Sequence, residues 1–133
     1  MVNGGIMKGK RIYKLSKSEK NFENIKFTIN KIIQICTDNN YKKIAVTTSS
    51  SKERGVGCFV AIFNRIIEEK KKELICEEIK PINMYADEFE KIKKFEVVIL
   101  IERYGDSYYT DVLEIKNMLN EIRVPYVGVI TCK

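Results

Sequence analysis

The residues with the greatest potential for chemistry lie in one loop that is rich in small and hydroxyl-bearing side chains. A largely apolar segment, 44–48, precedes this loop, and an amphipathic segment follows it. Strand, loop and helix in this order hold phosphate in many proteins, because backbone N–H groups at a helix start surround an anion. No Gly-Lys-Ser/Thr sequence closes the loop, so the lysine and hydroxyl that phosphoryl transfer needs are missing. The residues that could still surround an anion are Ser49, Ser50, Ser51, Lys52, Arg54, Gly55, Gly57 and Cys58.

Other common catalytic groups are absent or poorly spaced. The chain has no histidine, which excludes His-containing triads and His-based zinc sites. The four cysteines show no C-x-x-C spacing and lie within or beside apolar segments, so we expect buried, reduced thiols and neither a disulfide nor a metal site. These cysteines are Cys36, Cys58, Cys76 and Cys132. The sequence therefore predicts no bound metal and no cofactor.

Cys58 admits a second interpretation. A thiol near the amino end of a helix lies in the positive field of the helix dipole, which favours the nucleophilic thiolate. The position is therefore consistent with a nucleophile or a phosphocysteine carrier. Against this, Cys58 lies well beyond the preceding strand and beside Phe59, and a buried cysteine in the first helical turn is the simpler expectation.

The elements that must position this loop follow from the periodicity of the apolar residues. We expect helices that include 22–36, 59–67, 86–94 and 112–122, and strands over 43–48, 73–79, 96–102 and 126–131. Strands separated by helices imply right-handed crossovers and a mostly parallel sheet between two helical layers. The sequence thus predicts one three-layer α/β/α domain with about four strands over residues 18–133, preceded by a basic arm, 1–17.

The net charge of +6 is concentrated at the amino end. Residues 1–20 hold six basic residues and one acidic residue, whereas the other residues hold 18 basic and 17 acidic ones. Such an arm is attracted to anionic lipid, although a solvated leader is an equally good interpretation. No basic and aromatic residues alternate along a strand, so we expect no nucleic-acid partner. No apolar run approaches the roughly 20 residues of a membrane span, and the sequence predicts a cytoplasmic protein that can lie at the inner face of the membrane.

Two stretches and one helix resemble a known family. Residues 98–108 and 118–130 resemble the carboxy-terminal part of the bacterial tyrosine kinases of capsular and exopolysaccharide synthesis, which belong to the P-loop partition-ATPase superfamily. The expected leading helix is similar to the family helix that precedes the first strand and supports self-association. The positions that carry this similarity are Phe22, Ile25, Lys26 and Ile29. The resemblance implies a P-loop-NTPase-like fold.

The same resemblance implies that the nucleotide site has degenerated. Residues 55–60 are similar to a Gly-Val-Gly-Lys-Thr-Thr loop, with Cys58 at the lysine position and Phe59 at the hydroxyl position. Both side-chain functions that would hold the terminal phosphate and the magnesium ion are therefore lost.

Three further departures lie elsewhere in the chain. Cys76 replaces the first aspartate of the second strand, although Glu78 keeps a charge at the second acidic position. The region that carries the other acidic strand is shortened to 81–94, and Cys132 falls near the asparagine that would recognise the base. Loss at four separate places implies a protein that is not an enzyme.

The function that the resemblance implies is therefore a non-catalytic interaction or regulatory module in capsular or exopolysaccharide biosynthesis or export. Its expected partners are a membrane-embedded polysaccharide co-polymerase or chain-length regulator, or a second copy of the chain. Two alternatives remain open from the residues alone: a small anion- or nucleotide-binding domain that uses the 47–58 loop, and a phosphocysteine carrier that uses Cys58.

Overall fold

Five parallel strands and four helices make up the described part of the chain. The computed structural model describes residues 12–15, 21–49, 56–103 and 109–131. The strands are β1 (Ile12–Leu15), β2 (Lys43–Thr47), β3 (Ile75–Glu78), β4 (Val97–Arg103) and β5 (Tyr126–Thr131). The helices are α2 (Asn21–Asp38), α3 (Val56–Glu69), α4 (Ala86–Ile92) and α5 (Tyr109–Glu121). No helix in these described ranges is both long and apolar enough to cross a membrane.

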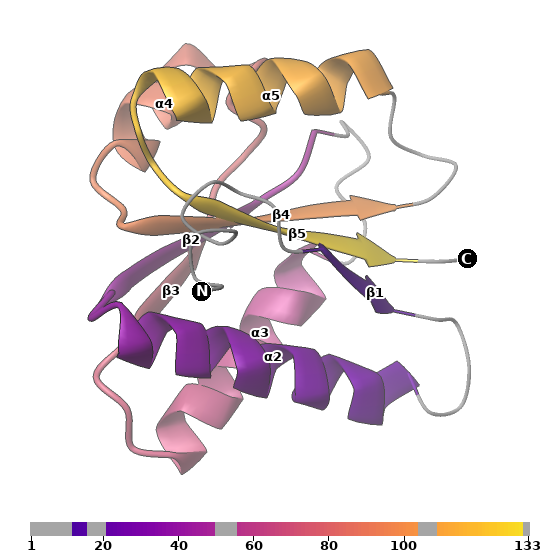
Figure 1. The fold of residues 1–133 in the computed structure, drawn as a ribbon, viewed down its shortest axis with the longest axis vertical. Helices are drawn as coiled ribbons and strands as arrows, with labels where there is room; N and C mark the ends of the chain where they lie inside the picture. The colour runs from indigo at the N-terminus through magenta and orange to yellow at the C-terminus, as the bar shows by residue number, and fades with distance from the viewer. Residues whose placement is uncertain (1–11, 16–20, 50–55, 104–108, 132–133) are drawn as a thin grey trace.

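The elements form the expected three layers. The strands lie in the order β1-β5-β4-β2-β3 and every pairing is parallel. Helices α2 and α3 cover one face of the sheet, and α4 and α5 cover the other (Figure 1). The three-layer α/β/α prediction is therefore confirmed, with one strand more than the four expected.

The additional strand is β1, which lies inside the segment that the sequence assigns to the basic arm. It pairs with β5 from Ile12 opposite Gly128 to Leu15 opposite Thr131. The strand has only four residues, and one of them is Lys14, so no apolar alternation distinguishes it from its basic surroundings. Pairing with β5, which is distant in the sequence, forms this strand, and local periodicity could not reveal it.

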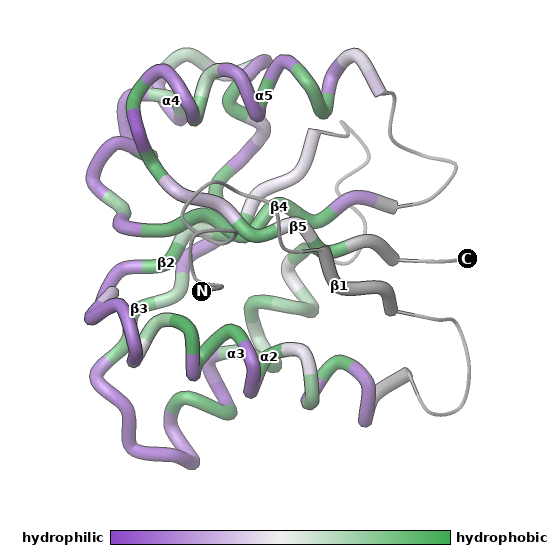
Figure 2. The backbone as a smooth tube through the Cα atoms, in the orientation of Figure 1, coloured by the Kyte–Doolittle hydropathy of each residue, from purple (hydrophilic) through white to green (hydrophobic). Residues whose placement is uncertain are grey.

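The unbroken apolar run of β4 is explained by burial on both faces. Val97, Ile99 and Ile101 belong to the core beneath α2 and α3, whereas Val98 and Leu100 belong to the core beneath α4 and α5. Apolar residues therefore follow the sheet and the inner sides of the helices, and hydrophilic residues lie outside (Figure 2). A strand with helices on both faces needs no alternation of polar and apolar residues.

Three helices end with the same backbone geometry. A non-glycine residue takes a left-handed conformation after α2, α3 and α5, at Asn40 (φ 59°), Lys71 (φ 54°) and Arg123 (φ 57°). The N–H of the next residue then donates to a carbonyl five residues earlier, from Tyr41 to Cys36 (2.8 Å), Lys72 to Ile67 (3.1 Å) and Val124 to Leu119 (3.0 Å). This Schellman geometry satisfies helix-end carbonyls and directs the chain into β2, β3 and β5.

The topology creates a switch point between β2 and β4. These two strands are neighbours in the sheet, but the helix that follows β2 covers one face and the helix that follows β4 covers the other (Figure 1). The two connections therefore diverge at the carboxyl edge of the sheet. Open α/β sheets bind their ligands at this kind of place.

Candidate functional site

The switch point is occupied by hydroxyl groups from the end of β2 and one carboxylate from β4. Thr48 and Ser49 follow β2, and both are buried, as is Glu102 on β4 with 9% of its surface exposed. Thr47 pairs with Leu100 in the β2–β4 register, so Ser49 and Glu102, each two residues further on, lie side by side. The register between two strands thus assembles this cluster.

The Glu102 carboxylate accepts hydrogen bonds from donors at the start of the loop. The Ser49 backbone N–H donates to Oε2 at 3.0 Å, and the Ser49 hydroxyl donates to Oε1 at 2.6 Å. The Thr48 hydroxyl lies 3.5 Å from the same Oε1. Hydrogen bonds to a charged group contribute about 1.5–3 kcal/mol each, so this tether fixes the exit of β2 against β4. The sequence analysis missed Glu102, because it closes an apolar run and only the strand register shows what it faces.

A second carboxylate lies on the other side of the β2 exit. Glu78 ends β3, the neighbour of β2 on the side away from β4. A Cβ placed on Gly57 would lie 3.5 Å from Glu78 Oε1, so this carboxylate lies against the first turn of α3. The helix dipole favours a negative charge there. The structure thus brings together Glu78 and Gly57, two of the residues singled out from the sequence.

Two carboxylates lie on either side of the point where the chain leaves β2. Glu102 and Glu78 come from the two strands that flank β2, so the chain leaves β2 between two negative charges. Each carboxylate also lies where a phosphate would seek a donor: one at the Ser49 N–H, the other at the first turn of α3. Like charges at close range repel, most strongly where water is excluded.

Cys58 is exposed, and the expectation that it is buried is wrong. The phase of α3 directs Val56, Phe59 and Phe63 into the core, and the Phe59 and Phe63 ring centroids lie 6.0 Å apart. With about 100° between successive helical residues, the residue before Phe59 points elsewhere. Phe59, which stands where the family has a magnesium-binding hydroxyl, is a core residue.

Cys36 and Cys76 are buried free thiols, as expected. Burial raises the pKa of each to about 12, with a smaller contribution from the negative charge of Glu96 for Cys36 and from Cys36 and Glu77 for Cys76. Both thiols are therefore protonated and unreactive near neutral pH. Cys132 lies outside the described residues.

The remaining loop positions also lie outside the described residues. These are Ser50, Ser51, Lys52, Arg54 and Gly55. The convergence of Lys52 and Arg54 on an anion therefore stays a prediction. Among the described residues, no group of three or more Cys, Asp or Glu side chains could hold a metal ion.

The leading helix α2 uses its family-like positions largely for packing. Ile29 is fully buried, and Ile25 packs against the same core. Lys26 Nζ lies 3.7 Å from Glu23 Oε2 in an exposed ion pair. The Phe22 side chain is not among those that the structure describes. The apolar side chain that α2 exposes most, within its described part, is Phe27, at 66%.

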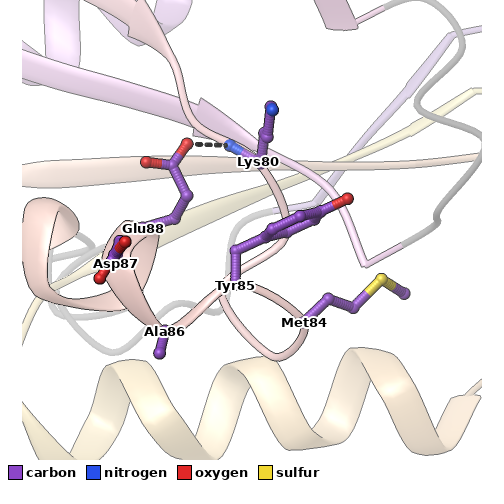
Figure 3. A pocket seen from close by; sticks show the side chains of 6 residues that line it. All are labelled: Lys80, Met84, Tyr85, Ala86, Asp87 and Glu88. Carbon is purple, nitrogen blue, oxygen red and sulfur yellow. Dashed lines mark hydrogen bonds between the residues drawn. The ribbon is translucent and has the colours of Figure 1, made fainter.

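An open cavity of about 450 Å³ lies where the chain passes from β3 to α4 (Figure 3). It is lined by Lys80, Met84, Tyr85, Ala86, Asp87 and Glu88. The Glu88 carboxylate accepts the Lys80 backbone N–H at 3.0 Å, and Lys80 Nζ lies 5.4 Å from the Tyr85 ring centroid. One cation and two carboxylates line the cavity, and both groups of Lys80 already have partners within it, so this cavity does not select an anion.

Comparison of the chain with protein-family models, with curated proteins and with solved structures finds no match. The resemblance to the polysaccharide tyrosine kinases therefore stays a prediction.

Proposed function

We propose that this chain is a non-catalytic interaction or regulatory module, built on a P-loop-like α/β scaffold, that serves capsular or exopolysaccharide biosynthesis or export. The observation that carries the non-catalytic part is the Glu102 carboxylate, which takes the Ser49 N–H and hydroxyl at the start of the loop. The resemblance in 98–108 and 118–130 supports the pathway.

The chemistry of the neighbouring positions supports the loss of nucleotide handling. Phosphoryl transfer depends on positioning and on neutralisation of charge by metal and lysine. The exposed thiol of Cys58 supplies no cation, and buried Phe59 supplies no metal ligand. Glu78, at the first turn of α3, adds negative charge where the phosphates would lie.

The proposed partner is a membrane-embedded chain-length regulator or a second copy of the chain, which would meet the exposed side of α2 at Phe27. The basic arm, 1–17, would lie beside anionic lipid at the inner face of the membrane. Because residues 12–15 form β1 in the sheet, the test removes residues 1–11 only. Anionic-vesicle binding that persists after this removal would count against that role of the arm.

A calorimetric titration with ATP and ADP, with and without magnesium, tests the loss of nucleotide binding. We expect no saturable heat at nucleotide concentrations up to about 1 mM, because exposed Cys58 and buried Phe59 supply neither the lysine nor the magnesium ligand of a phosphate loop. The comparison variant is Cys58→Lys, which restores the missing lysine ammonium but not the magnesium ligand. This variant should bind ATP weakly at most. Tight binding to the natural chain that requires magnesium would contradict the proposal.

The exposure of Cys58 favours a second candidate function, a phosphocysteine carrier. We expect Cys58 to react with a maleimide in the folded chain near neutral pH, whereas buried Cys36 and Cys76 react only after unfolding. Mass spectrometry of the separated peptides measures each rate, with Cys58→Ser as the control. A Cys58 rate far above that of a free peptide thiol would show a stabilised thiolate and favour the carrier.

A further inference from the structure

We propose that the exit of β2 is a small-oxyanion site that Glu102 keeps closed, with its carboxylate in the position that a phosphate or sulfate would take. This inference rests on the proposed function, because it names the device that keeps anions out of the loop. The Glu102 carboxylate is itself an anion, and it is bound by one backbone N–H and two hydroxyl groups. Donors of this kind bind oxyanions in proteins.

A further donor lies on the same face of the sheet. Thr47 is fully buried, and its hydroxyl has no hydrogen-bond partner among the described residues. Side chains two residues apart on a strand share a face, so Thr47 and Ser49 project to the same side. Leu100 pairs with Thr47, and Glu102, two residues beyond Leu100, joins them on that side. The Thr47 hydroxyl is therefore a further donor for an oxyanion on this side of the sheet.

Two other carboxylates accept strand-end N–H groups but lack the features of such a site. Glu96 accepts the N–H groups of Lys42 and Lys43 at the opposite edge of the sheet, and Glu88 accepts that of Lys80. Both contacts are exposed and neither includes a hydroxyl. Glu102 differs by its burial, its hydroxyl partners and its place at the switch point, where ligands of open sheets bind. Glu96 therefore provides a matched control.

The expected ligand is a small anion, because it must match the size and charge of the Glu102 carboxylate that it would replace. A phosphate or sulfate ion can take the same donors once the Glu102 side chain is removed. A nucleotide would extend towards α3, where Glu78 lies against the first turn. The site is therefore expected to accept inorganic oxyanions and to reject polyphosphates.

Thermal unfolding of the full chain in increasing inorganic phosphate, with chloride at equal ionic strength as the reference, tests this inference. We expect the midpoint of Glu102→Ala to rise by about 5 °C for each tenfold increase of phosphate above its Kd. The natural chain and Glu96→Ala should show no rise beyond that in chloride. Adding Ser49→Ala to Glu102→Ala should abolish most of the gain.

Folded Glu102→Ala with the same midpoints in phosphate, sulfate and chloride would overturn the inference. If Glu102→Ala does not fold, Glu102→Gln decides: it keeps the side-chain volume but loses the charge, and should gain a smaller phosphate response. No response there would equally overturn the inference. Magnesium-dependent ATP binding by the natural chain would instead refute the proposed function, so the two failures are distinguishable.

Discussion

Replacing Phe63 by alanine is expected to lower the free energy of unfolding by about 3–5 kcal/mol. Phe63 is fully buried on α3 and is among the largest fully buried side chains of the described residues. It packs in the cluster beneath α2 and α3, with its ring centroid 6.0 Å from that of Phe59. The loss of stability has two parts: the transfer free energy of the removed ring and the cost of the cavity that it leaves in the core.

Denaturant unfolding followed by circular dichroism measures this loss, with Phe27→Ala as the matched control. Phe27 is the same residue type on the neighbouring helix but is 66% exposed, so its truncation should change stability by no more than about 0.5 kcal/mol. Equal losses for the two variants would contradict the placement of α3 and α2 against the sheet. A large loss at Phe27 alone would show that another surface covers it in solution.

The sequence predicted the helices and strands that are defined by the periodicity of neighbouring residues. A strand was expected over 96–102, and β4 (Val97–Arg103) covers nearly the same residues. A leading helix was expected to include 22–36, and α2 (Asn21–Asp38) contains this range. These predictions succeeded because periodicity and helix termination depend on residues close together in the chain.

The features that the sequence did not predict depend on contacts between distant residues. Strand β1 is defined by its pairing with β5, and Glu102 acquires its partners from the register of β2 against β4. Cys58 was expected in the core because it stands among apolar residues, but the exact phase of α3 decides which of them face the sheet. A displacement of one residue, about 100° on a helix, separates buried Phe59 from exposed Cys58.

The two buried thiols predict a loss of stability at alkaline pH. Burial raises the pKa of Cys36 and Cys76 from 9.0 to about 12 in the folded chain. Between pH 9 and 12 the folded state therefore keeps these protons, while the unfolded state releases them. The unfolded state binds fewer protons in that window, so the free energy of unfolding falls as pH rises. The contribution is fully present below pH 9 and is lost as pH rises towards 12.

The expected effect is on the order of a few kcal/mol over the whole window, since each pKa unit corresponds to 1.36 kcal/mol. Denaturant unfolding at intervals from pH 9 to 12 measures it. Cys76→Ala removes one titrating group and should flatten the decline, whereas Cys58→Ala, at an exposed position, should leave the slope unchanged. A decline of equal slope in Cys76→Ala and the natural chain would contradict the prediction.

The two buried thiols also act on each other through their charges. The pKa of Cys76 is raised first by burial and then by the charge of Cys36, so part of the effect at Cys76 requires an ionised Cys36. Coulombic coupling between two groups is reciprocal, so Cys36→Ala and Cys76→Ala each remove it, and each variant should flatten the decline.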